Sequence, residues 1–248
     1  MQLPPLSENS LKDKVILVTG AGDGIGRAAA LSFARAGATL ILLGRTVSKL
    51  EAVYDEILSE GGAEPAIVPL DLCGATLSHY QQMAQTIQEQ FKRLDGVLHN
   101  ASQLGYLRPF AQIPEKEWQD IMQVNLTSQF YMTQALLPLL LQAPHASVIF
   151  TSSGVGRKGR AYWGSYAVSK FATEGMMQVL ADEYANSKVR FNCINPGATR
   201  TKMRAKAYPA EDANQLKTPE DIMPLYLYLM SDQSIDVNGQ SLDAQPKK

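Results

Sequence analysis

A tyrosine and a lysine stand four residues apart in the stretch Tyr166-Ala-Val-Ser-Lys170. Residues four apart share one face of a helix, so a phenol and an ammonium group can point into one site. A free tyrosine has a pKa of about 10, and lowering it by roughly three units requires about 4 kcal/mol. A nearby positive charge favours the ionised phenol and could supply part of that energy. Alone, such a pair is more often a solvated or core contact than a catalytic one.

Two other polar residues come from elsewhere in the chain. Ser153 ends the stretch Thr151-Ser-Ser153, directly after a short apolar run, and Asn125 lies further upstream. Open α/β sheets bind ligands outside the carboxyl ends of their strands, which is where Ser153 is expected. This position makes Ser153 a candidate site residue.

A glycine-rich turn follows the first apolar run, with Gly20, Gly24 and Gly26 spaced as Gly-x-x-x-Gly-x-Gly and Ile25 between the last two. Glycines allow a tight turn and a close approach of the backbone to a pyrophosphate, and the helix that follows presents free N–H groups. The spacing therefore favours a dinucleotide site. The alternative is a tight turn between a strand and a helix that binds nothing.

The end of the second apolar run carries Gly44-Arg45 and no acid. NAD-binding folds usually place Asp or Glu near this point to hold the ribose 2′-hydroxyl. A guanidinium can instead hold a 2′-phosphate by charge-assisted hydrogen bonds, so Arg45 favours NADP over NAD. Alternatively Arg45 is a solvated charge, and Asp23 in the glycine turn argues weakly against NADP.

Short apolar runs alternate with longer stretches of helical spacing. The runs predict strands at 14–19, 39–43, 66–70, 96–99, 147–151 and 189–194, and a short seventh strand at 240–243. Helices are predicted at 25–36, 46–60, 77–91, 115–141, 166–185 and 219–230. Continuous apolar strands separated by helices indicate a parallel sheet covered on both faces. We therefore expect an α/β fold, a Rossmann-type doubly wound parallel sheet of about seven strands with helices on both faces.

No linker or repeat divides the chain, so residues 13–248 are expected to form a single dinucleotide-binding catalytic domain after a flexible leader, 1–12. The longest irregular segment is 197–217, and a stretch of that length inside a domain often forms a lid.

The composition excludes several classes of protein. The 248 residues include 23 Lys and Arg and 24 Asp and Glu, so no broad basic surface for nucleic acid is expected. Two cysteines are too few for a disulfide scaffold, and the three histidines have no second ligand at metal spacing. The sequence shows no secretory signal and no apolar stretch long enough to cross a bilayer. We expect a cytoplasmic protein that binds no metal, nucleic acid or membrane.

The glycine turn, Asn125, Ser153, Tyr166 and Lys170, in this order, resemble the classical short-chain dehydrogenase/reductase family. Other segments are similar to motifs of that family: Asp71-Leu72, Asn100-Ala-Ser102 with Ser102 in place of a glycine, and Asn195-Pro196-Gly197-Ala-Thr199-Arg-Thr201. The match runs from Lys14 to about Asp243. Within the family, the residues on either side of the Tyr166–Lys170 stretch resemble the bacterial YciK-like oxidoreductases.

The resemblance implies a role for each catalytic residue. Tyr166 would be the general acid in carbonyl reduction and the general base in alcohol oxidation. Ser153 would hydrogen-bond the substrate oxygen, and Lys170 would lower the Tyr166 pKa, together with an oxidised nicotinamide ring, and bind the nicotinamide ribose. Asn125 would distort its helix locally and hold a water molecule in a proton relay to Lys170.

The resemblance also implies NADP as the cofactor that carries the hydride. Asp71 would lie beside the adenine. Ile194, Pro196 and Gly197 would form a wall of the nicotinamide site, and Thr199 and Thr201 would contact the carboxamide or the phosphates. The expected cofactor-binding residues are Gly20, Gly24, Ile25, Gly26, Arg45, Asp71, Asn100, Tyr166, Lys170, Pro196, Gly197, Thr199 and Thr201.

The leading hypothesis is thus an NADP(H)-dependent oxidoreductase acting on a small-molecule carbonyl or alcohol. Segments 103–108, 154–164 and 197–217 should line its pocket, with Tyr106, Tyr162 and Trp163 making it partly aromatic. Arg157 and Arg160 lie in an exposed loop or face an anionic substrate or the cofactor phosphates. The apolar stripe Met176, Met177 and Leu180 belongs to the core or, as in much of the family, to a homodimer or homotetramer contact.

Two other functions compete with this hypothesis. A sensor or scaffold that binds NADP(H) with little turnover would need the glycine turn and Arg45, but none of Ser153, Tyr166 and Lys170. A methyltransferase built on the same sheet fits poorly, because such sites usually have an acid at the end of the second strand.

Overall fold

Seven strands form one sheet in the order β3-β2-β1-β4-β5-β6-β7, and every neighbouring pair is parallel. The computed structural model describes residues 4–5, 7 and 9–246. The strands are β1 (Val15–Thr19), β2 (Thr39–Gly44), β3 (Ala66–Pro69), β4 (Gly96–His99), β5 (Ala146–Thr151), β6 (Val189–Asn195) and β7 (Ser241–Asp243). The chain reverses its direction across the sheet between β1 and β4, and this reversal opens the crevice in which doubly wound sheets bind ligands.

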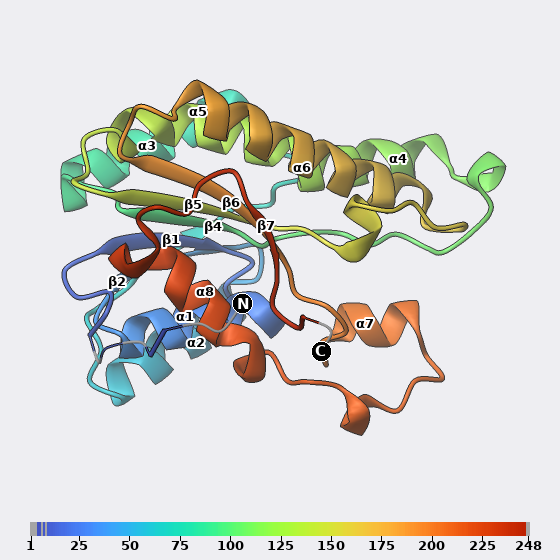
Figure 1. The fold of residues 1–248 in the computed structure, drawn as a ribbon, viewed down its shortest axis with the longest axis horizontal. Helices are drawn as coiled ribbons and strands as arrows, with labels where there is room; N and C mark the ends of the chain where they lie inside the picture. Colours follow the sequence, from blue (N-terminus) through green and yellow to red (C-terminus); the bar gives the residue numbers. More distant parts are fainter. Residues whose placement is uncertain (1–3, 6, 8, 247–248) are drawn as a thin grey trace.

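Helices cover both faces of the sheet (Figure 1). The α-helices are α1 (Gly24–Arg35), α2 (Val47–Ser59), α3 (Leu77–Phe91), α4 (Glu115–Met122), α5 (Ser128–Leu140), α6 (Gly164–Glu183), α7 (Lys202–Ala207) and α8 (Met223–Met230). Helices α1, α2 and α8 lie on one face, and α3, α5 and α6 lie on the other. Shorter turns are the 3-10 helices η1 (Phe110–Gln112), η3 (Gly154–Gly156), η4 (Ala213–Gln215), η5 (Glu220–Ile222) and η6 (Asp232–Ser234), and the π-helical turn η2 (Gln123–Thr127).

Each face of the sheet has its own hydrophobic core. On one face Phe33 of α1 and Tyr226 of α8 pack below the strands, and on the other Tyr80 of α3 and Leu136 of α5 pack above them. Strands β1, β4 and β5 are buried along their whole length, which explains their continuous apolar sequences. The predicted doubly wound sheet with helices on both faces is therefore confirmed.

The predicted bounds of all seven strands agree with the structure to within one residue at each end. The helix predicted at 115–141 is divided into α4 and α5 by η2, and the segment 197–217, predicted to be irregular, contains α7. Its sequence, Lys-Met-Arg-Ala-Lys-Ala, has no apolar periodicity, and the helix begins instead because the Thr201 hydroxyl accepts the N–H of Arg204.

The predicted leader, 1–12, lies partly outside the described residues. Within its described part Leu11 is fully buried, and its N–H donates to the carbonyl of Ala36 at 2.9 Å. The division into a leader and one domain over 13–248 stays a prediction. Over the described ranges 4–5, 7 and 9–246, no helix is both long enough and apolar enough to cross a membrane.

Candidate active site

The glycine turn between β1 and α1 has no room for side chains at its closest point. A Cβ at Gly26 would lie 2.2 Å from the carbonyl oxygen of Gly20 and 2.7 Å from Asn100 Nδ2. Gly20 and Gly24 have φ of +68° and +54°, which residues with side chains rarely adopt. A Cβ at Gly24 would lie 3.6 Å from the methyl group of Thr201. The turn is therefore closed by Asn100 on one side and by Thr201 on the other.

Asp23 caps α1 and is held by two lysines. One carboxylate oxygen accepts the N–H of Gly24 at 2.9 Å, and the other accepts Lys49 Nζ at 2.6 Å and Lys202 Nζ at 2.8 Å. The hydrogen bonds from Lys202 and Lys49 lower the pKa of Asp23 to about 2. The acid that argued against a 2′-phosphate is thus accompanied by two positive charges, and Lys202 connects α7 to the glycine turn.

Arg45 and Asp71 lie at the ends of neighbouring strands, because the N–H of Leu70 donates to the carbonyl of Gly44 at 2.9 Å. Arg45 is exposed, and no carboxylate of the described residues pairs with it. Asp71 is also exposed and accepts the N–H of Cys73 at 3.1 Å. A free guanidinium at this place can meet a phosphate without first breaking an ion pair.

Ser153, Tyr166 and Lys170 meet beyond the carboxyl end of β5. Lys170 Nζ donates to the carbonyl of Thr151 at 2.7 Å and lies 5.5 Å from the centroid of the Tyr166 ring. Ser153 lies close enough to the Tyr166 hydroxyl to lower the pKa of that phenol. The structure thus brings the three side chains together from a strand end and one helix face, as their spacing predicts.

Burial dominates the ionisation of this cluster. It raises the pKa of Tyr166 to about 12, with Ser153 acting in the opposite direction. Burial also lowers the pKa of Lys170 to about 8, while Cys193 and Glu174 act to raise it. Tyr166 therefore holds its proton at neutral pH. The expected lowering of the Tyr166 pKa by Lys170 together with an oxidised nicotinamide stays a prediction.

Asn125 is fully buried and lies in the π-helical turn η2. The expected local distortion of its helix is therefore present. Its side-chain oxygen accepts the N–H of Gln103 at 2.7 Å, and its Nδ2 donates to the Gln103 carbonyl at 2.9 Å and to Ser169 Oγ at 3.0 Å. Ser169 Oγ donates to the carbonyl of Tyr166 at 2.7 Å. Asn125 thus ties the segment after β4 to the catalytic helix, and its predicted water relay stays a prediction.

The segment after β6 is held in place by its own hydrogen bonds and by Gln245. Gln245 Nε2 donates to the carbonyls of Pro196 at 2.9 Å and Ala198 at 3.0 Å. Thr199 is buried, and its hydroxyl donates to the carbonyl of Pro196 at 3.2 Å. Gly197 turns the chain with φ of +72°. Thr199 therefore serves its own loop in this structure, whereas Thr201 reaches the glycine turn.

Aromatic rings extend outward from Tyr166. The Trp163 ring lies 5.8 Å from that of Tyr166 and 6.0 Å from that of Tyr208, between ring centroids. An apolar cluster surrounds Tyr166, formed by Leu104, Val155, Ala167, Trp163, Met203 and Ala207. Tyr162 is exposed, whereas Trp163 packs beside Tyr166 and forms the aromatic wall of the site. The segment 197–217 contributes Met203 and Ala207 to the same apolar cluster.

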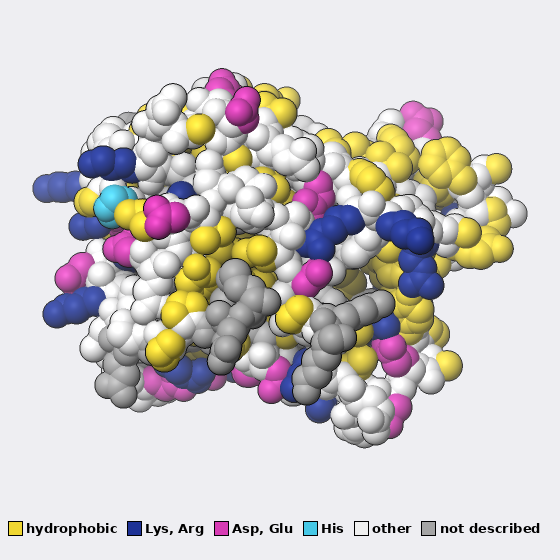
Figure 2. All heavy atoms as spheres, viewed as in Figure 1, with side chains coloured by type: hydrophobic (Ala, Val, Ile, Leu, Met, Phe, Trp, Pro, Cys, Tyr) yellow, Lys and Arg dark blue, Asp and Glu magenta, His cyan; other side chains and the backbone are white. Residues whose placement is uncertain are grey.

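Cations lie around this apolar wall. Arg160 Nη1 donates to the Tyr208 hydroxyl at 3.1 Å, and Lys206 Nζ lies 4.1 Å from the centroid of the Tyr106 ring. Neither cation pairs with a carboxylate in the described part of the chain. Figure 2 shows Lys and Arg side chains next to a hydrophobic area on the end of the molecule that carries α4 and α7.

Arg157 is exposed, as the first of the two alternatives predicts, but its guanidinium is occupied by partners within the chain. Its guanidinium donates to Asp243 at 2.6 Å and to Ser241 at 2.9 Å, and it lies 3.6 Å from the carboxylate of Glu174. Glu174 is a buried residue that the sequence reasoning missed. Its position four residues after Lys170 on a helix was the available signal.

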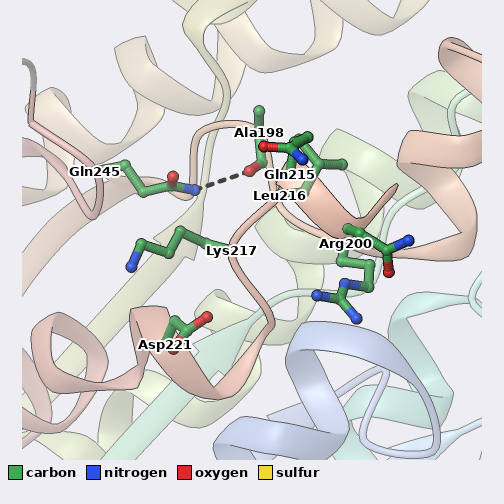
Figure 3. A pocket seen from close by; sticks show the side chains of 8 residues that line it. Ala198, Arg200, Gln215, Leu216, Lys217, Asp221 and Gln245 are labelled. Atoms are coloured by element: carbon green, nitrogen blue, oxygen red, sulfur yellow. Dashed lines mark hydrogen bonds between the residues drawn. The ribbon is translucent and has the colours of Figure 1, made fainter. Parts of the chain in front are cut away.

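A cavity of about 520 Å³ lies between the segment 197–217 and the end of the described chain (Figure 3). Its lining includes Arg200, Lys217 and Asp221, and Gln245 closes one side through its hydrogen bond to Ala198. None of Ser153, Tyr166 and Lys170 lines it. The catalytic cluster and this cavity are therefore separate features.

A dinucleotide phosphate fits the turn. A Cβ at Gly26 would collide with backbone, so the closest point of the turn is bare main chain at the N-terminus of a long helix. Arg45 stands free at the end of the next strand. In the part of the chain that the structure describes, no group of three or more His, Cys, Asp or Glu residues could hold a metal ion.

The family model for short chain dehydrogenases matches residues 14–212, and the chain belongs to that family of oxidoreductases. Oxidoreductase YciK of Escherichia coli K12 is 58% identical over 239 residues, which are 96% of this chain and 94% of that protein. Within the family the chain lies in the YciK-like branch. Both the expected family and the expected branch are confirmed.

Solved structures agree with this assignment. A short chain dehydrogenase of Shigella flexneri 2a complexed with NADP has 57% identity and a TM-score of 0.95, over 97% of this chain and 100% of that chain. One of Escherichia coli CFT073 complexed with NADPH has the same identity, TM-score and coverage. More distant is the 3-oxoacyl-[acyl-carrier-protein] reductase FabG of Thermotoga maritima, 30% identical over 93% of this chain and 95% of that protein.

Proposed function

We propose that this protein is an NADP(H)-dependent oxidoreductase that interconverts carbonyl and alcohol groups, with Tyr166 as its general acid and base. The cluster of Ser153, Tyr166 and Lys170 at the carboxyl end of β5 carries this proposal. These side chains supply a proton donor, a second hydrogen-bond donor and a positive charge at the edge where doubly wound sheets bind ligands.

In carbonyl reduction, Ser153 and Tyr166 donate hydrogen bonds to the substrate oxygen and stabilise the negative charge that develops on it. The nicotinamide, when bound, supplies the hydride in reduction and accepts it in oxidation. Tyr166 then transfers its proton to the oxygen, and the ammonium of Lys170 stabilises the phenolate that remains. Its pKa of about 12 keeps Tyr166 protonated until the oxygen becomes basic enough to take the proton.

The cofactor contacts follow from the positions of the side chains. Gly20, Gly24, Ile25 and Gly26 would place the N-terminus of α1 against the pyrophosphate. Arg45 would hold the 2′-phosphate of NADP(H), the cofactor with which two structural relatives are complexed. The other residues assigned to the cofactor are Asp71 at the adenine, Asn100, Tyr166 and Lys170 at the ribose and nicotinamide, and Pro196, Gly197, Thr199 and Thr201 around the carboxamide and phosphates.

The surroundings of Tyr166 favour a substrate with an apolar or ring-containing body. Trp163 and the apolar cluster around Tyr166 would contact that body. Arg160 and Lys206 have no carboxylate partner in the described chain and would attract a negatively charged group at its far end. A carbonyl compound that also carries a carboxylate or phosphate suits both features.

The molecule is further proposed to be a cytoplasmic homodimer or homotetramer. Met177 is fully buried, and Met176 and Leu180 pack against the same core, so the predicted apolar stripe of α6 belongs to the core. Other apolar side chains of α6 remain exposed on the helical layer shown in Figure 1, among them Phe171 at 45% and Val179 at 63%. Contacts between copies of the chain would cover them.

The proposal is tested by mixing the purified protein with NADPH and a panel of aldehydes, ketones and quinones, each neutral compound matched by an analogue with a carboxylate. Oxidation of NADPH, followed by absorbance and by identification of the alcohol, is the expected result. Tight binding of NADPH without turnover of any panel member would contradict the proposal and favour a sensor.

A further inference from the structure

Glu174 is a buried ionisable residue on the catalytic helix that the proposed reaction does not use. It follows Tyr166 and Lys170 at intervals of four residues on α6, so the three side chains occupy one face of the helix. Only 5% of its surface is exposed. A carboxylate is ionised in such a place only when hydrogen bonds and a positive charge compensate for the lost water.

Those compensating groups are present. Glu174 Oε1 accepts Ser152 Oγ at 2.5 Å and Ser241 Oγ at 2.7 Å, and it lies 3.6 Å from Arg157 Nε. Ser152 directly precedes Ser153, and Ser241 begins β7. The carboxylate therefore joins the turn that carries Ser153 to the catalytic helix and to the last strand.

The other titratable groups that face the ammonium of Lys170 are kept neutral by burial. Burial raises the pKa of each of them: Tyr166 on α6, Cys193 on β6 and Tyr226 on α8. From β5 the contact is uncharged, since Lys170 Nζ donates to the carbonyl of Thr151. Arg157 and Asp243, beside Glu174, pair with each other at 2.6 Å, so their charges partly cancel. Glu174, four residues after Lys170 on the same face of α6, is thus the carboxylate that acts to raise the pKa of Lys170.

We propose that Glu174 is a positioning residue for this reaction, which anchors the turn that presents Ser153 and maintains Lys170 in its cationic form. A buried negative charge favours the charged form of a neighbouring amine and opposes the effect of desolvation. The inference rests on the proposed function, in which only a cationic Lys170 stabilises the Tyr166 phenolate.

The variant Glu174→Gln tests the charge with little change in shape, because the amide keeps an oxygen that can accept both serine hydroxyls. The titration of Lys170 is followed by NMR of the protein labelled with ¹³C-lysine, and its signal is assigned by its loss in Lys170→Arg. In Glu174→Gln the titration is expected to move to lower pH by about one unit. Arg157→Gln removes a positive charge from the same cluster and is expected to move the titration to higher pH.

A titration of Lys170 that stays unchanged in Glu174→Gln overturns the proposal. If Glu174→Gln does not fold, Arg157→Gln decides alone, and an unchanged titration there overturns it equally. Because this readout needs no substrate, a protein that reduces no carbonyl compound would refute the proposed function while the NMR titration still decides the role of Glu174.

Kinetics separate positioning from a merely structural role. In carbonyl reduction the alkaline decline of kcat/KM is expected to shift to lower pH in Glu174→Gln, by about the same interval as the NMR titration. Glu183→Gln, the same substitution at an exposed position of α6, is the matched control and should leave the profile unchanged. A loss of activity that is equal at every pH would contradict the proposal.

Discussion

Replacement of Arg45 by Asp should exchange the cofactor preference of this protein. Arg45 is exposed at the end of β2 and has no carboxylate partner in the described residues, so a 2′-phosphate would meet a guanidinium that is already free. A hydrogen bond to a charged group contributes roughly 1.5–3 kcal/mol, which corresponds to a factor of about 10 to 100 in affinity. The lower part of this range applies, because solvent screens an exposed arginine.

The introduced aspartate adds a second effect of opposite sign for the two cofactors. Its carboxylate repels the 2′-phosphate of NADPH and can accept hydrogen bonds from the ribose hydroxyls of NADH. We therefore expect NADPH to bind at least about 10-fold more weakly to Arg45→Asp, while the affinity for NADH stays equal or rises. Lys49 remains beside Asp23, so some affinity for the 2′-phosphate should persist.

The assay is equilibrium titration of NADPH and NADH into the wild type and the variant, monitored by the fluorescence of the reduced nicotinamide. Lys188→Asp is the matched control, since it makes the same change of charge at an exposed residue. Lys188 precedes the amino end of β6, whereas Arg45 follows the carboxyl end of β2. A ratio of NADPH to NADH affinity that is the same in Arg45→Asp and in the wild type would refute the assignment of Arg45.

Three further predictions concern the turn, the buried amine and the substrate. Gly26→Ala should abolish nucleotide binding and lower the free energy of unfolding by about 1–3 kcal/mol, because its Cβ would lie 2.2 Å from the carbonyl oxygen of Gly20. In Gly74→Ala the added Cβ would have no atom within 4 Å, so this control should keep both its nucleotide binding, measured by titration, and its stability, measured by a thermal melt. Burial lowers the pKa of Lys170 from 10.5 to about 8, so the unfolded chain binds more protons between these values and the free energy of unfolding should rise with pH there. The difference in the free energy of unfolding between the wild type and Lys170→Met, measured by urea unfolding, should grow by an amount on the order of 3 kcal/mol over this pH range. A difference that does not change with pH would exclude the lowered pKa of Lys170. Arg160→Gln should raise the KM of a carboxylate-bearing substrate up to about 5-fold and leave the KM of its neutral analogue unchanged. An equal change in the two KM values would show that Arg160 does not contact the anion.

Strands β1, β4 and β5 were predictable because each is a largely apolar run that is buried along its whole length. The glycine turn and the pair Tyr166 and Lys170 were predictable because backbone geometry and helix periodicity fix their spacing. These features depend on residues that are close in sequence.

The rest depends on contacts between distant residues. The π-helical turn at Asn125 is stabilised by Gln103 and Ser169, which no local pattern connects to it. Arg157 was open to a role in ligand binding because its partners Glu174 and Asp243 lie far along the chain. The effect of burial, which raises the pKa of Tyr166 in the polypeptide, could not be predicted, since the spacing of two residues does not reveal the depth at which they are buried.

The central claim is that the Tyr166 hydroxyl transfers a proton to the substrate oxygen, and the variant Tyr166→Phe removes that one atom. The decisive measurement compares kcat/KM for NADPH-dependent reduction of the best carbonyl substrate in the wild type and in this variant, with NADPH affinity and the melting temperature recorded beside it. We expect a loss of about 10²- to 10⁴-fold with NADPH affinity and folding retained. A Tyr166→Phe protein that reduces the substrate as fast as the wild type would contradict the account.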